Sequence, residues 1–195
     1  AVDVNSVEAL ISAVNNGTSY IKLTKNIELG NSTLTIFSGT ITLDLNGKTL
    51  SATRMSNGAA TCISVNGGNL IITGGGTISA TAKGTTEGVW GSGKNGYDGI
   101  ALSYNGGSVA IRNATFKAIA TNGAGIISGS NGTAYTLDPN NGYTVDNMIP
   151  AGAYMTNSSD YGSTGLVSSS ITVVLTQYNA VSYTHLRAHE TELHL

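Results

Sequence analysis

Hydrophobic and polar residues alternate with two different periods along the chain. Near the start, four aliphatic residues recur at helical spacing, which predicts a helix over residues 5–16. Asn5 is the expected N-cap, Glu8 stands three residues later as in a capping box, and Gly17 occupies the position after the helix end. After Gly17 the period changes to two, which is typical of β-strands.

The runs that alternate with period two predict short strands. Asn-Gly pairs, which favour tight turns, occur nine times along the chain. Together with a single helix, these runs indicate an all-β fold. The strands are expected at residues 20–23, 40–45, 62–65, 69–73, 99–104, 108–112, 115–120, 133–137 and 170–175.

Several of the predicted strands are copies of one another. Aligning them makes Leu45, Ile72 and Ile111 equivalent, with steps of 27 and 39 residues. The longer step contains a glycine-rich insertion at 81–99. The matching segments are LDLNGKTL at 43–50, LIITGGGTI at 70–78 (with one extra glycine) and VAIRNATF at 109–116, and, in a second match, SVNGGNLII at 64–72 and SYNGGSVAI at 103–111.

A repeat of about 25 residues without a helix favours a β-solenoid. In such a fold each repeat pairs with the repeats before and after it, and inward residues stack into one continuous core. Thr and Ser are suitable outward residues because they favour strands and are uncharged. Leucine-rich repeats are the competing architecture, but their leucine and asparagine spacing is absent.

The repeated segments resemble a known family. TLDLNGKTLSA followed by VNGGNLIITGGGTISA is similar to the right-handed parallel β-helix domains, pectate-lyase-like in fold, of bacterial secreted and surface proteins. VEALISAVNNGTSYIKLTKNIEL resembles their usual start, a short amphipathic helix before the first strand. The resemblance covers about residues 5–120. It implies an all-β fold, a right-handed parallel β-helix with a short N-terminal capping α-helix.

On this basis we divide the chain into three parts. Residues 1–18 form the N-terminal capping helix, 19–180 form the parallel β-helix, and 181–195 form a non-native tail. VSYTHLRAHET at 181–191 resembles a translated sequencing adapter, as occurs in assembled metagenomic sequence. We therefore expect the β-helix to be truncated near residue 180. A truncated final coil would expose strand edges, which favours end-to-end or edge association.

Composition narrows the classes of function. Charged residues make up 10% of the chain and the net charge is −2, without any basic run, so nucleic-acid binding is not expected. No run of apolar residues is long enough to span a membrane. A single cysteine excludes an internal disulfide. The many Gly, Thr and Asn residues, and a start at Ala1 without a leader, predict a secreted or cell-surface location.

Candidate catalytic groups are scattered. Catalytic β-helix relatives place carboxylates together on neighbouring coils, whereas the carboxylates here occur singly and match no catalytic motif. We therefore predict no catalytic residue, no metal site and no cofactor. A phosphate-loop-like pattern at 88–94 lacks a following helix, so it predicts a surface loop. The carboxylates considered are Asp44, Glu87, Asp98, Asp138, Asp146 and Asp160.

Trp90 and Tyr97 are the candidate glycan contacts. Both lie in or next to the glycine-rich insertion, and aromatic rings on a flat sheet can stack on sugars. The structural alternative is that Trp90 packs on the flank of the fold. The sequence predicts a non-catalytic β-helix module, adhesin-like or glycan-binding, with surface glycans or host or cell-wall polysaccharide as partners. The alternatives are the N-terminal part of a polysaccharide lyase or glycoside hydrolase whose catalytic rungs are missing, and a spacer without a ligand.

Overall fold

The computed structural model describes residues 1–84, 97–120, 125–130, 154–158, 163–168 and 170–175. Within these ranges the protein is all-β apart from one short helix, which confirms the predicted class. In chain order the elements are β1 (Val2–Val4), α1 (Val7–Asn15), β2 (Tyr20–Leu23), β3 (Ile27–Glu28), β4 (Leu34–Ile36), β5 (Thr40–Asp44), β6 (Thr49–Arg54), β7 (Ala60–Thr73), β8 (Gly76–Ala82), β9 (Gly99–Ile111), β10 (Ala114–Ala120), β11 (Gly125–Ser130), β12 (Tyr154–Ser158), β13 (Ser163–Ser168) and β14 (Ser170–Leu175).

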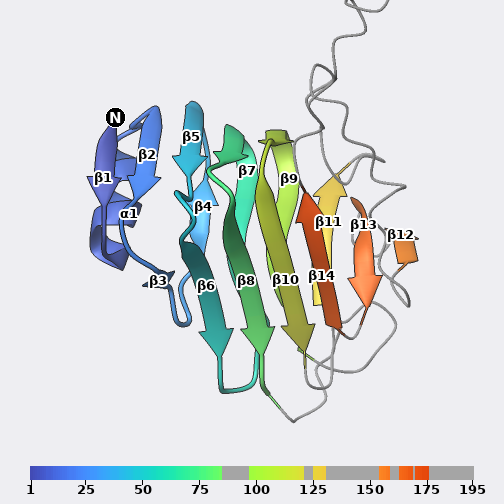
Figure 1. The fold of residues 1–195 in the computed structure, drawn as a ribbon. Coiled ribbons are helices and arrows are strands. Elements are labelled where there is room, and N and C mark those ends of the chain that lie inside the picture. Colours follow the sequence, from blue (N-terminus) through green and yellow to red (C-terminus); the bar gives the residue numbers. More distant parts are fainter. Residues whose placement is uncertain (85–96, 121–124, 131–153, 159–162, 169, 176–195) are drawn as a thin grey trace, which may run out of the picture.

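The strands form two sheets. The first has the order β1-β2-β5-β7-β9-β11-β13-β12, with β4 also paired to β7, and the second has the order β14-β10-β8-β6-β3. Figure 1 shows β6, β8, β10 and β14 side by side, with β7, β9 and β11 behind them and α1 next to β1 and β2 at the N-terminal end. From β5 to β11, the strands of one sheet alternate along the chain with those of the other.

Parallel pairing dominates the N-terminal part and ends near the C-terminus. The pairs from β1 to β11 in the first sheet, and from β3 to β10 in the second, are parallel. In contrast, β14 pairs antiparallel with β10, β13 with β11, and β12 with β13. These antiparallel pairs depart from the parallel pairing expected for the whole of residues 19–180.

The core consists of aliphatic rows that run across neighbouring strands. Leu43 pairs with Ile72 and Ile72 with Ile111 in the first sheet, and all three side chains are buried. In the second sheet, Leu50 pairs with Ile78 and Ile78 with Phe116, again all buried. A single buried cluster includes both rows. Alternation with period two thus places the inward residues of β5, β6, β8 and β10 in one shared interior.

The repeats are in register, but one predicted equivalence was wrong. Leu43, rather than Leu45, is the partner of Ile72, whereas the match of 64–72 with 103–111 is confirmed. Leu45 is buried like a core residue, but it lies in the turn after β5. The alignment failed because the segment between the two core rows shortens, from six residues (44–49) to five (73–77) and then to four (112–115). The segment with three glycines is therefore shorter than the first, not longer.

Helix α1 spans Val7–Asn15, and its N-cap lies one residue later than predicted. Ser6 is the N-cap and its hydroxyl accepts a hydrogen bond from the Ala9 backbone N–H at 3.2 Å, so Asn5 does not have this role. Gly17 ends the helix as predicted: its φ is 68°, and the N–H groups of Gly17 and Thr18 donate to Val14 and Ala13. The buried side chains of α1, which include Leu10, join the core at the N-terminal end.

Several strand predictions were incomplete. The strands expected at 62–65 and 69–73 form one strand, β7, and those at 99–104 and 108–112 form β9. Strands β6 and β8 were not predicted, because their inward positions include alanines between Thr and Ser, which weakens the hydrophobic pattern. The strand expected at 133–137 and the tail at 181–195 lie outside the described residues.

Candidate functional site

Of the two predicted glycan contacts, Tyr97 alone lies within the described residues, so their pairing stays a prediction. Trp90 lies outside the described residues. Tyr97 is half-buried and packs against the core, and a Cβ on Gly84 would lie 3.0 Å from its Cδ2 atom. The Tyr97 ring therefore covers the flank of the second sheet near the turn after β6. This packing is what the structural alternative proposed for Trp90.

Asp44 has a structural role at the end of β5. Its Oδ2 accepts a hydrogen bond from the Tyr20 hydroxyl at 2.8 Å, and its Oδ1 accepts one from the Asn46 backbone N–H at 2.8 Å. The hydrogen bond to the Asp44 carboxylate, assisted by its negative charge, raises the pKa of Tyr20 above its usual value. Both carboxylate oxygens are thus used to hold neighbouring strands and the turn.

Glu28 is bound in the same way at the edge of the second sheet. Its Oε1 accepts hydrogen bonds from the backbone N–H groups of Thr53 at 2.8 Å and Gly30 at 3.0 Å. Its Oε2 accepts one from the Ser51 hydroxyl at 2.6 Å. Glu28 therefore provides hydrogen-bond acceptors for backbone and hydroxyl donors at the edge of the sheet, next to the two-residue strand β3.

The remaining titratable groups form no recognisable catalytic or metal centre in the part of the chain that the structure describes. No group of three or more His, Cys, Asp or Glu side chains there is placed to hold a metal ion. Asp98 is buried, and burial of Cys62 raises the pKa of its thiol. The phosphate-loop-like segment, Glu87, Asp138, Asp146 and Asp160 lie outside the described ranges.

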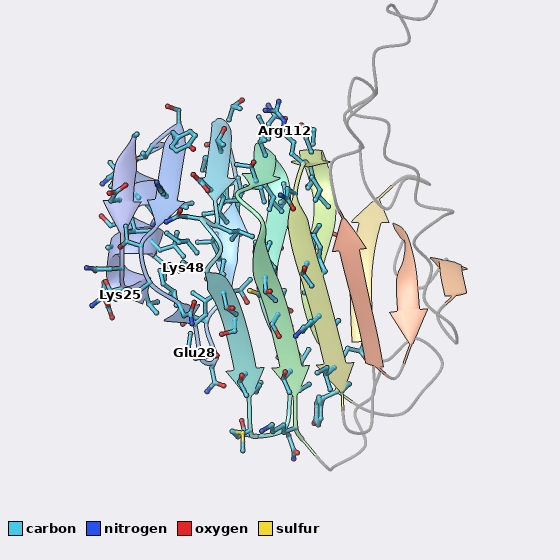
Figure 2. The ribbon with its side chains drawn as sticks, viewed as in Figure 1. Lys25, Glu28, Lys48 and Arg112 are labelled. Carbon is cyan, nitrogen blue, oxygen red and sulfur yellow. The ribbon has the colours of Figure 1, made fainter. Side chains whose placement is uncertain are left out.

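Basic side chains are dispersed. Figure 2 shows Lys25, Glu28 and Lys48 near the N-terminal end of the molecule, whereas Arg112 stands apart from them where β9 ends. A polyanionic ligand is held by several converging cations. The labelled basic residues do not converge on one place.

A different surface of the molecule carries only uncharged residues. It lies where β4 continues into β5, next to the middle of β7 and β9. We call it the uncharged patch and define it as residues 35–40, 64–69 and 103–108, none of which is charged. Its outward side chains form three rows across the strands: Thr35, Ser64 and Ser103; Phe37, Asn66 and Asn105; and Thr40, Asn69 and Ser108.

The register places Phe37 in line with the two asparagines. The pairs on either side of it, Ile36 with Val65 and Thr40 with Asn69, have the same offset of 29 residues, so Phe37 lies beside Asn66. Asn105 is an additional residue at a bulge in β9, and its Nδ2 donates to Asn66 Oδ1 at 3.1 Å. Adjacent strands are about 4.8 Å apart, so the patch extends about 10 Å across the sheet.

The side chains of the uncharged patch bond to one another. Asn66 Oδ1 also accepts from the Ser64 hydroxyl at 3.1 Å, and Asn105 Nδ2 reaches Ser103 Oγ at 3.4 Å. In the third row, Asn69 Nδ2 donates to Thr40 Oγ1 at 3.3 Å. Asn69 Oδ1 accepts from the Ser108 hydroxyl at 2.8 Å. These bonds fix the orientation of the amides at an exposed surface.

Phe37 and a small hollow complete this surface. Phe37 is 69% exposed, the highest value among the exposed large hydrophobic residues of the described chain. The hollow, of about 100 Å³, lies between the end of α1 and the patch and is lined by Val14, Asn15, Thr35, Phe37 and Ser38. A water occupies about 30 Å³, so the hollow can hold a few waters or part of a sugar ring.

Sequence reasoning missed this surface. Phe37 stands between two short strands and carries no motif, so only the pairing register reveals that it is in line with Asn66 and Asn105. The recurrence of Asn-Gly-Gly at 66–68 and 105–107 was a usable signal. Taken by itself, it predicts turns and the alignment of two repeats, but not an exposed surface.

No family model, no curated protein and no solved structure matches the chain. The resemblance to pectate-lyase-like β-helix domains therefore remains a prediction. Separately, no helix within the described ranges is long and apolar enough to cross a membrane.

Proposed function

We propose that the chain is a right-handed parallel β-helix that serves as a non-catalytic, glycan-binding module of a bacterial secreted or cell-surface protein. The fold is supported by β5 to β11, which alternate between two sheets and pair in parallel one repeat apart. Connections between parallel strands of one sheet are right-handed in about 98% of cases, which supports the handedness. The antiparallel strands β12–β14 would then form the C-terminal end of the β-helix.

One observation carries the binding role. In-register stacking arranges Ser, Thr and Asn side chains as exposed rows on a rigid surface, next to one exposed aromatic ring. Sugars present hydroxyl groups at their edges and C–H groups on their faces, so they match such a surface. The carboxylates Glu28 and Asp44 are bound to backbone and hydroxyl donors, which suits a structural role better than acid–base catalysis.

The experiment that tests this proposal separates binding from catalysis. The purified chain is incubated with neutral polysaccharides (a β-glucan, xylan, mannan) and acidic ones (polygalacturonate, alginate), and both retention of the protein and release of reducing ends are measured. We expect retention without product. Release of product would instead support the lyase or hydrolase alternative, and a lack of retention on every polysaccharide would support a spacer.

A further inference from the structure

We propose that the uncharged patch binds a neutral, linear polysaccharide whose chain runs across the strands, with one sugar ring stacked on Phe37. This inference rests on the proposed glycan-binding function and specifies its site and its ligand. The site differs from the Trp90 and Tyr97 loop that the sequence suggested.

The patch favours an uncharged ligand. Strands β4, β7 and β9, and residues 37–39 that follow β4, contain no charged residue. A carboxylate or sulfate placed here would lose part of its hydration without gaining a charged partner, which is unfavourable. A neutral hydroxyl-rich ligand loses less, because each of its hydroxyls can exchange water for an amide or hydroxyl of the patch.

The polar groups of the patch are preorganised for such an exchange. Asn66 and Asn105 are each held by bonds to a neighbouring side chain, so little side-chain freedom is lost when a ligand binds. Within the described chain, neither Asn66 Nδ2 nor Asn105 Oδ1 has a hydrogen-bond partner. One donor and one acceptor are therefore available side by side to sugar hydroxyls.

Phe37 distinguishes a sugar from other neutral ligands. Its ring is 69% exposed and stands in the same row as the two asparagines. An exposed aromatic face beside hydrogen-bonding groups matches a pyranose ring, which has an apolar face and a polar edge. An apolar peptide would need a wider hydrophobic surface than a single ring provides.

The rows set the direction of the bound chain. Phe37 directly after β4, Asn66 in β7 and the bulge residue Asn105 in β9 follow one another across the sheet, in which adjacent strands are about 4.8 Å apart. The hollow beside the end of α1 continues this line on the other side of Phe37. A polysaccharide lying across the strands would thus contact the hollow, the ring and the two amides in succession.

The test is affinity gel electrophoresis of the full chain in gels that contain a neutral β-glucan, xylan, mannan or polygalacturonate. Three variants probe the site: Phe37→Ala, Phe37→Tyr and Asn105→Ala. Met55→Ala is the matched control, because Met55 is also an exposed hydrophobic residue (67%) but lies just after β6, outside the patch. Circular dichroism and thermal unfolding establish that each variant is folded.

We expect the wild type to be retarded by at least one neutral polysaccharide. Phe37→Ala should weaken this binding about tenfold through loss of ring stacking. Asn105→Ala should weaken it about threefold to tenfold through loss of one amide. Phe37→Tyr and Met55→Ala should remain within about twofold of the wild type, since the first keeps the ring and the second leaves the patch unchanged.

The other outcomes overturn the inference in distinguishable ways. If neutral glycans retard the wild type and both alanine variants of the patch equally, the site lies elsewhere although the chain still binds glycans. Retardation by polygalacturonate alone would overturn the neutral ligand. If no polysaccharide retards the folded wild type, both this inference and the proposed function fail.

Discussion

Two regions of the molecule use similar residues in opposite ways. In the turns that link the core rows (residues 44–49, 73–77 and 112–115), polar side chains bond to the backbone. Asn46 Nδ2 donates to the Leu23 carbonyl at 3.0 Å, and the Thr49 backbone N–H is bound at 2.9 Å by Oδ1 of Asn26, which directly precedes β3. In the uncharged patch, the side-chain hydrogen bonds of Asn66, Asn69 and Asn105 go to other side chains.

The difference separates residues that support the fold from residues that it merely displays. A side chain that satisfies a backbone group in a turn contributes to stability, because that group would otherwise lose a partner. A network of exposed side chains contributes little, since water can replace each bond. The asparagines of the patch are therefore the ones whose chemistry the fold does not require.

The largest expected effect concerns the backbone of the uncharged patch, where glycine is needed. Gly107 has a φ of 84°, and a Cβ at this position would collide with the carbonyl oxygen of Gly68. Gly107→Ala should lower the free energy of unfolding by about 2 kcal/mol or more, measured by urea denaturation. Gly106→Ala is the control, because its nearest neighbours would be 3.9 Å away, and a similar loss there would contradict the argument.

Substitutions in the linking turns should have the next largest effect on the free energy of unfolding. Asn46 has a positive φ of 48° and donates its Nδ2 to Leu23. Asn46→Ala removes this bond and places alanine in the left-handed region, so the free energy of unfolding should fall by about 2 kcal/mol. Asn46→Gly removes only the bond and should cost about 1 kcal/mol. Equal losses from the two variants would show that the left-handed conformation carries no cost for alanine at this position.

An asparagine of the patch should behave differently from Asn46. Asn66→Ala removes bonds to Ser64 and Asn105, but these groups are exposed to water. Its free energy of unfolding should change by less than about 0.5 kcal/mol in the same urea assay. A loss as large as that of Asn46→Ala would remove the distinction between the two regions.

The smallest effect is a pH dependence at the bond between Tyr20 and Asp44. The bond requires a protonated phenol, and the pKa of Tyr20 is raised in the folded state. Its stabilisation is therefore fully present below the ordinary pKa of about 10, and is lost as pH rises through the raised value. The difference in unfolding free energy between wild type and Tyr20→Phe should shrink from pH 9 to about pH 12. A difference that is constant over this range would be inconsistent with the bond.

The sequence predicted what hydrophobic periodicity and repetition determine. The helix, the all-β class and the match of Ile72 with Ile111 follow from residues that must be buried together. Leu45 was misaligned because burial in a turn looks the same as burial in a strand. Phe37 could not be found because its significance depends on which residues lie beside it, and the pairing register was not available from the sequence.

The linking segments shorten from six residues to five to four, so the corner that joins the two sheets contains one residue fewer in each successive repeat. Consecutive repeats are therefore not interchangeable. Removing the middle repeat would place a six-residue linking segment directly next to a four-residue one, and two surplus residues would have to bulge outward. Engineering a longer or shorter version of this protein would succeed only if the linking segments of neighbouring repeats still differed in length by no more than one residue.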